Sequence, residues 1–192
     1  MDKEKREKCI EIYRQTKNFN KAVKGSGLSV CAVQIILAKA GLLTLHDKVF
    51  YGTRAVRLGG EAEMLFQKLV PEAINLNDVV MANHPAYDFD YKGLKIDVKY
   101  SSKHRPNEWR NYSPYYKVKV GNRDKDLIVA FFERDFGMEL EKPYIAILHQ
   151  SMAYRGNITF TVGVDSFKEV LVKPSELNMI LDEYVELMYE RA

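Results

Sequence analysis

Residues 87–100 constrain the fold most strongly, because apolar and polar side chains alternate on both sides of a Lys92-Gly93 pair. Alternation of this kind predicts a β-strand with one apolar face, and a two-residue connection that ends in Gly is typical of a tight hairpin turn. The sequence therefore predicts a β-hairpin with arms 87–91 and 94–100. Its apolar face would carry Tyr87, Phe89, Tyr91, Leu94, Ile96, Val98 and Tyr100.

The length of the turn fixes which polar residues face each other across the hairpin. Asp90 should lie opposite Lys95, which is an ordinary charge pair, and Asp88 should lie opposite Asp97. Two like charges at facing positions destabilise a β-ladder, whereas a divalent cation between two carboxylates turns the repulsion into a binding site. Lys99 falls on the same face, two residues beyond Asp97, where its ammonium group could hold a phosphate or a water molecule.

This arrangement resembles the active site of the PD-(D/E)XK nuclease superfamily, in which an acid near the end of one strand precedes acid-x-Lys on the next. Here the pattern stands as Asp88 and Asp97-Val98-Lys99. The family adds a Glu on a preceding helix, and Glu63 in Gly60-Glu61-Ala62-Glu63-Met64 matches the family's Ala-Glu pattern better than Glu61 does. Asp88 follows Tyr rather than Pro, which departs from the family pattern. The resemblance covers roughly residues 59–150.

The resemblance implies a restriction-endonuclease-like core, in which helices flank a mixed sheet, and a metal-dependent endodeoxyribonuclease activity. Mg²⁺ (or Mn²⁺) would be held by Asp88, Asp97, Glu63 and the backbone carbonyl of Val98. Lys99 would orient the attacking water or stabilise the transition state. Glu61 stays open as the third acid in place of Glu63.

Three short helices are expected at the N-terminus, over residues 4–16, 18–26 and 29–39. Asn18 and Ser29 are suitable N-cap residues, and Gly41 is placed to end the third helix. The segment resembles the helix-turn-helix of resolvases and of transposase N-termini. The matching residues are Tyr13-Arg14-Gln15-Thr16-Lys17-Asn18, Ala22-Val23, Gly27-Leu28-Ser29, Val33, Leu37 and Ala40-Gly41-Leu42.

In such modules the third helix enters the major groove of DNA. The resemblance makes Ser29, Gln34 and Lys39 candidate DNA contacts, with Val30, Ala32 and Ile35 beside them. This helix is poor in Arg and Lys, which departs from the usual reading helix. The alternative is a three-helix module that packs against another subunit or against the nuclease domain.

The net charge of the chain is only +3, but its distribution is uneven. Residues 1–58 carry 12 basic and 5 acidic side chains, residues 92–125 carry 10 and 3, and residues 165–192 carry 3 and 7. Two basic regions indicate a surface that faces a polyanion, although lysines also solvate ordinary faces. The candidate DNA contacts in these regions are Arg54, Arg57, Lys103, His104, Arg105 and Arg110, with Trp109 or Tyr112 able to stack on bases.

The remainder of the chain predicts strands near residues 115–120, 126–132, 144–148 and 158–162, and a C-terminal helix that begins at Pro174-Ser175-Glu176. The expected class is α+β, with a helix-turn-helix domain (1–43), a linker (44–58) and a nuclease-like domain (59–192). The C-terminal helix carries an apolar stripe, which suits either the core of its own domain or a dimer interface. The stripe consists of Leu177, Ile180, Leu181, Tyr184 and Met188.

The composition predicts a cytoplasmic protein that acts on intracellular DNA. No run of 18 apolar residues suggests a membrane span, and the charged N-terminus lacks the apolar segment of a signal peptide. Cys9 and Cys31 fall on apolar helical positions and are expected to be core thiols in a reducing compartment.

Several activities fit these expectations. A site-specific (homing or restriction-like) endonuclease of a phage or mobile element would cut double-stranded DNA, and a junction resolvase would cut branched DNA. A transposition nuclease is a third candidate. A DNA-binding regulator without catalytic activity is the alternative from another class. A homodimer or higher homo-oligomer is expected for an enzyme that cuts both strands with one site per chain.

Overall fold

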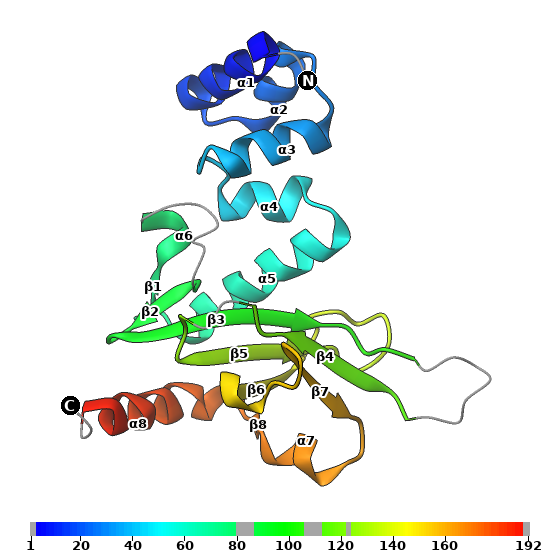
Figure 1. Ribbon diagram of the computed structural model, residues 1–192, viewed down its shortest axis with the longest axis vertical. Coiled ribbons are helices and arrows are strands. Elements are labelled where there is room, and N and C mark those ends of the chain that lie inside the picture. Colours follow the sequence, from blue (N-terminus) through cyan, green and yellow to red (C-terminus); the bar gives the residue numbers. More distant parts are fainter. Residues whose placement is uncertain (1–2, 80–86, 106–112, 122–123, 190–192) are drawn as a thin grey trace. The chain divides into compact units, whose positions relative to one another are not determined.

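The computed structural model describes residues 3–79, 87–105, 113–121 and 124–189 of the 192-residue chain (Figure 1). The chain divides into two compact units. The N-terminal unit is drawn mainly from residues 1–60, and the sheet unit from residues 61–75 and 85–192. The helices of the N-terminal unit are α1 (Lys3–Thr16), α2 (Phe19–Ser26), α3 (Val30–Lys39), α4 (Leu45–Tyr51), the first part of α5 (Arg54–Leu69) and α6 (Leu76–Val79).

The first three helices form where the sequence predicts them, and their caps explain why. The Asn18 side chain accepts a hydrogen bond from the Lys21 N–H at 3.0 Å, and the Ser29 hydroxyl accepts one from the Ala32 N–H at 3.2 Å. Gly27 ends α2 with a φ of 65°, a left-handed conformation that costs Gly little. The core between these helices contains Cys9, Tyr13, Phe19, Ala22, Val33, Ile36, Leu37 and Leu43.

The axes of α2 and α3 are bent by 113° relative to each other. These two helices are apolar and long enough to cross a membrane only when they are counted together. Within the part of the chain that the structure describes, no single helix is long and apolar enough to do so.

The segment 44–58, expected to be a linker, contains helix α4 and the first turn of α5. Asp47 in α4 is buried, and its carboxylate accepts hydrogen bonds from the hydroxyl groups of Tyr13 and Thr44. The ring of Tyr51 stacks on that of Phe19, with 4.4 Å between their centroids. Contacts with α1 and α2 therefore hold this short helix, and the local sequence does not reveal such contacts.

One prediction about the cysteines is wrong. Cys9 is buried in the N-terminal core, as expected, but Cys31 is exposed. Val33, Ile36 and Leu37 set the inward face of α3. Cys31 therefore falls on the outward face, although it adjoins apolar residues in the sequence.

The sheet unit is built on a six-stranded mixed sheet with the order β1-β2-β3-β5-β6-β8 among the described residues. β3 and β5 pair in parallel, and the other neighbours pair antiparallel. The mixed sheet and the surrounding helices confirm the α+β class. The strands are β1 (Ile74–Asn75), β2 (Phe89–Tyr91), β3 (Leu94–Ser101), β5 (Leu127–Phe132), β6 (Tyr144–His149) and β8 (Leu171–Val172).

Different elements pack on the two faces of this sheet. On one face, the part of α5 from residue 61 onward and α8 (Leu177–Tyr189) pack against Ile96 and Val98. On the other face, a second sheet of β4 (Tyr115–Lys119) and β7 (Asn157–Thr161) packs with α7 (Asp165–Glu169). Because side chains alternate along a strand, Asp97 and Lys99 leave β3 on the face opposite to the helices.

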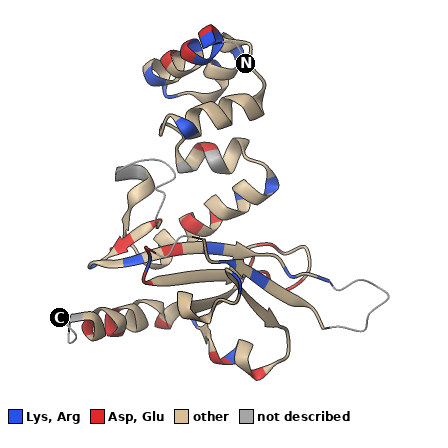
Figure 2. Cartoon of the chain, viewed as in Figure 1, with Lys and Arg blue, Asp and Glu red and all other residues tan. Residues whose placement is uncertain are grey.

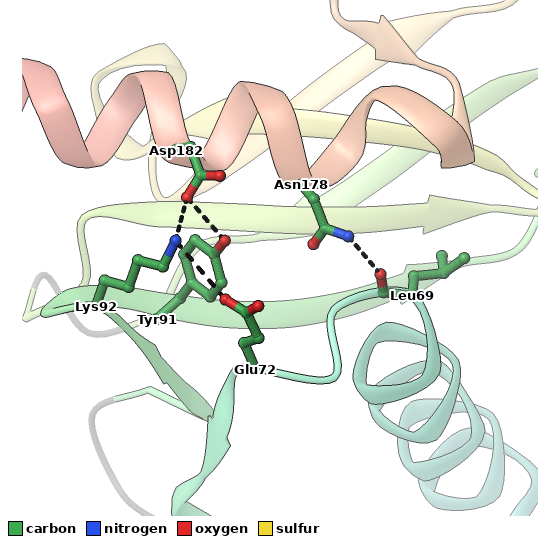
Figure 3. A network of polar contacts seen from close by, with 6 residues as sticks. All are labelled: Leu69, Glu72, Tyr91, Lys92, Asn178 and Asp182. Atoms are coloured by element: carbon green, nitrogen blue, oxygen red, sulfur yellow. Dashed lines mark hydrogen bonds and ion pairs between the residues drawn. The ribbon is translucent and has the colours of Figure 1, made fainter.

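Polar contacts fasten α8 to the hairpin turn (Figure 3). Asp182 accepts hydrogen bonds from the Tyr91 hydroxyl at 2.8 Å and from the Lys92 ammonium at 2.7 Å. Asn178 donates to the carbonyl of Leu69 at 3.1 Å, which joins the start of α8 to the end of α5. These contacts join the hairpin turn to α8 and the start of α8 to the end of α5.

The apolar stripe of α8 covers the sheet of its own chain. Leu177 and Leu181 are fully buried, and Ile180 and Tyr184 pack against the same core. Met188, the last residue of the stripe, is 48% exposed. The first turn of this segment, Pro174–Glu176, is a 3₁₀ helix, as is Gln150–Met152 after β6. Of the two roles expected for the stripe, the structure shows the packing role.

Candidate active site

The hairpin has the register that its turn predicts. Asp90 pairs with Lys95, and Lys92 and Gly93 at the turn have φ values of 52° and 86°, as tight hairpin turns require. Asp88 lies just beyond the paired residues, and its N–H donates to the Ile96 carbonyl at 2.9 Å. Charged positions thus follow one another along β2 and β3 (Figure 2).

Asp88 and Asp97 lie close enough to affect each other's charge. One oxygen of Asp88 accepts the Val98 N–H at 2.8 Å, which holds the carboxyl against the edge of β3. Burial and, next in size, the negative charge of Asp97 raise the pKa of Asp88 to about 6, while Lys99 opposes the shift. The facing carboxylates predicted from the register are therefore present, and they repel each other when both are ionised.

Asp97 is buried, and its two oxygens contact different lysines. The ammonium of Lys99 lies 2.5 Å from Oδ1, and the ammonium of Lys125 contacts Oδ2. The two lysines differ in exposure, because the side chain of Lys99 is 34% exposed and that of Lys125 only 3%. Two carboxylates and two ammonium groups thus form one compact cluster.

Lys125 is the site residue that the sequence analysis missed. It comes just before the start of β5 and reaches Asp97 because β5 pairs in parallel with β3. Asp126 fixes this approach: its carboxylate accepts the Lys95 N–H at 2.8 Å, and its own N–H donates to the Lys95 carbonyl at 2.9 Å. The signal in the sequence is the charged run Asp124-Lys125-Asp126 directly ahead of a continuous apolar strand.

Glu63 is buried on α5, in the same unit as the two aspartates. No three His, Cys, Asp or Glu side chains among the described residues are arranged to hold one metal ion. The structure brings Asp88 and Asp97 together, and the role of Glu63 as a third ligand stays a prediction.

The donor set at the end of the hairpin fits one hard divalent cation. The available groups are the carboxylates of Asp88 and Asp97 and the carbonyl of Val98. This carbonyl points to the same side of β3 as the Val98 N–H that binds Asp88, because both groups of a strand residue face the same neighbour. Carboxylate and carbonyl oxygens are the ligands that Mg²⁺ and Mn²⁺ prefer.

Three of the predicted DNA contacts follow β3 directly. The buried carboxylate of Glu133 accepts the Lys103 N–H at 2.8 Å, which anchors this loop. His104 and Arg105 are exposed, and the guanidinium of Arg105 lies 4.2 Å from the ring centroid of Phe136. The segment after β3 therefore carries cations, and one of them lies on an aromatic ring of the segment that follows β5. Arg110, Trp109 and Tyr112 lie outside the described residues.

The predicted DNA contacts of the N-terminal unit have different roles in the structure. Ser29 caps α3 through its hydroxyl, and the amide of Gln34 donates to the carbonyl at the end of α4. Lys39 and Arg54 are exposed, and Arg57 is half-buried. The two polar candidates thus contribute to the fold of the unit, while two of the three cations face solvent.

The cluster has the elements of a site for phosphate chemistry: oxygen ligands for a cation, and a partly exposed ammonium beside them. Comparisons of the chain with protein-family models, with curated proteins and with solved structures found no match.

Proposed function

We propose that the protein is a Mg²⁺-dependent endonuclease that hydrolyses phosphodiester bonds in DNA. The observation that carries this proposal is the placement of Asp88 against Asp97 at the open end of the β2–β3 hairpin, with Lys99 on the same carboxylate. A buried and a half-buried carboxylate that repel each other favour a bound divalent cation. The acid-x-Lys order places an ammonium group beside them.

Each residue of the site has a distinct role in this proposal. Asp88, Asp97 and the Val98 carbonyl hold the cation. When bound, Mg²⁺ lowers the pKa of a coordinated water and neutralises charge on the phosphate. Lys99 is exposed enough to reach substrate, and its ammonium donates a hydrogen bond to the attacking water or to a phosphate oxygen in the transition state. The proposal requires these two carboxylates and does not depend on Glu63.

Features of both units support a DNA substrate. In the sheet unit, Lys103, His104 and Arg105 follow the strand that carries Asp97 and Lys99. In the N-terminal unit, α2 and α3 are bent by 113° around a turn that contains Gly27, which is the geometry of a helix-turn-helix. The proposed architecture is therefore a helix-turn-helix joined to a restriction-endonuclease-like core. The proposed substrate is duplex DNA or branched DNA.

A DNA-binding regulator without catalytic activity is a second candidate, and one observation favours it. Both oxygens of Asp97 contact lysine ammonium groups. In such a cluster the lysines already balance the charge of Asp97, so no metal cation is needed. The cluster could stabilise a nuclease-like fold that only binds DNA.

One experiment separates the two candidates. The purified protein is incubated with supercoiled plasmid, a four-way junction and single-stranded DNA, with either Mg²⁺ or EDTA. Asp88→Asn, which keeps the shape of the side chain and removes its charge, is the matched control. Cleavage that requires Mg²⁺ and is lost in the variant supports the nuclease. DNA binding without cleavage supports the regulator, and full cleavage by the variant refutes the assigned site.

A further inference from the structure

We infer that Lys125 is a positioning residue that limits the Asp88–Asp97 site to a single divalent cation. The inference rests on the proposed function, because it concerns the cation bound at that site. Its basis is the unequal environment of the two lysines on Asp97.

Lys99 can leave Asp97 at little cost, whereas Lys125 cannot. A third of the Lys99 side chain is exposed, so water can solvate its ammonium when the contact with Oδ1 breaks. Only 3% of the Lys125 side chain is exposed, and Asp97 is its ion-pair partner within the described residues. An ammonium that stays buried after losing its partner carries a large desolvation penalty. Lys125 therefore stays on Oδ2.

Because Lys125 is buried, the two oxygens of Asp97 differ in whether they can bind a cation. Oδ2 is occupied by a fixed positive charge, and Oδ1 becomes available when Lys99 moves aside. Oδ1 lies on the carboxylate that raises the pKa of Asp88, so these two groups face each other. One cation can be shared between them. A second divalent ion at Oδ2 would lie beside the ammonium of Lys125 and be repelled by it.

The structure also explains why Lys125 stays in place. The backbone of Asp126 is hydrogen-bonded to Lys95 on β3, and the Asp126 carboxylate adds a second contact to the same residue. These bonds fix the backbone at Asp126, which lies between Lys125 and the first residue of β5. Lys125 therefore approaches Asp97 from a backbone position that is fixed one residue away.

Counting bound Mn²⁺ on the full-length protein tests this role without any measurement of cleavage. Titration calorimetry gives the affinity, and electron paramagnetic resonance of free Mn²⁺ gives the number of ions bound. The variants are Lys125→Met, which removes the charge at similar size, and Lys125→Arg, which keeps the charge. Lys119→Met is the matched control, because Lys119 is exposed on β4 and its loss changes the total charge equally.

We expect one Mn²⁺ per chain for the wild type, for Lys125→Arg and for Lys119→Met. Lys125→Met should bind a second ion or bind the first at least about tenfold more tightly, since removing a unit charge about 6 Å from a divalent ion has roughly that effect even with water-like screening. If Lys125→Met does not fold, Lys125→Gln carries the same expectation, because its amide can still donate to Asp97.

Two ions in the wild type would overturn the role of Lys125. One ion at unchanged affinity in Lys125→Met would also overturn it and would leave the proposed metal site standing. No bound ion in the wild type would overturn both, so the failure of the site and the failure of this inference give different results.

Discussion

At the scale of single residues, Asp88 should make the stability of the metal-free protein depend on pH. Its pKa is raised to about 6 by burial and by Asp97, whereas an unfolded Asp titrates near 4. The folded state therefore binds the proton more tightly, so the stabilisation is complete below about pH 4 and is lost as the pH rises through 6. In EDTA we expect a loss of up to about 3 kcal/mol between pH 4 and 7.5. Urea unfolding across this range measures it.

Two variants isolate the contribution of Asp88 from those of other groups. Asp88→Asn should remove this part of the pH dependence. Asp90→Asn, which removes the charge of a carboxyl two residues further along the chain, should keep the wild-type profile. If Asp88→Asn and the wild type have identical profiles, the Asp88–Asp97 pair is not the origin of the effect.

Lys99→Ala should lose catalysis and keep the cation. Loss of a donor that acts in the transition state lowers the rate by about a hundredfold or more. The Mg²⁺ affinity should not fall, because an ammonium group is not a metal ligand. Single-turnover cleavage and calorimetric titration measure the two effects. Lys95→Ala, on the same face of β3, should cleave normally. A large loss of Mg²⁺ affinity in Lys99→Ala would assign Lys99 a structural role.

Asp97→Ala should destabilise the fold. The sequence suggests two repelling carboxylates, whereas the structure adds the buried ion pair between Asp97 and Lys125. Removing one member of a buried pair leaves the other charge without compensation, which costs about 3–5 kcal/mol. Chemical denaturation in EDTA measures the loss. The double variant Asp97→Ala/Lys125→Met should recover part of it, and no recovery would mean that the pair is not the cause.

At the scale of elements, local patterns predicted the hairpin correctly and missed its long-range partner. The turn at Lys92-Gly93 and strict alternation set the register of β2 and β3, because both signals are contained within a few residues. Lys125 reaches Asp97 only through the parallel pairing of β5 with β3, which brings together residues far apart in the chain.

Helix boundaries were also predicted correctly where local contacts set them and missed where tertiary contacts did. α2 and α3 begin at the predicted caps, since Asn18 and Ser29 act on the backbone of the next turn. α4 forms because Asp47 and Tyr51 contact α1 and α2, and such tertiary contacts leave no local pattern. α5 starts at Arg54, inside the segment expected to be a linker, so the glycines at 59 and 60 lie within the helix.

The N-terminal unit should contribute to the salt dependence of DNA binding. Lys39 is exposed at the end of α3, and each phosphate contact adds about one to the slope of log K against log salt. Lys39→Ala should therefore lower the slope by about one. Lys168→Ala, an exposed lysine of α7, should leave it unchanged. An unchanged slope in Lys39→Ala would favour a role of α3 in assembly.

At the scale of the whole molecule, the charge pattern and the buried stripe of α8 bear on how the chain assembles. Leu177 and Leu181 are buried in the core of the sheet unit, so this part of the predicted interface is not available to a partner. The outer side of the helix still exposes Met179 and Leu187. These residues are eight positions apart, about 80° around the helix axis, and therefore lie on the same side of the helix.

A nuclease with one Asp88/Asp97/Lys99 site per chain needs two chains, or two successive visits, to cut both strands of a duplex. We therefore expect a dimer, in which the exposed side of α8 could pair with itself across a two-fold axis. Light scattering at micromolar concentration should give twice the 22.2 kDa mass of the chain. Met179→Lys/Leu187→Lys should give the monomer and turn double-strand cuts into nicks, whereas Val164→Lys, at an exposed position before α7, should stay dimeric. A wild type that is monomeric both alone and on DNA would contradict the dimer and indicate a nicking enzyme.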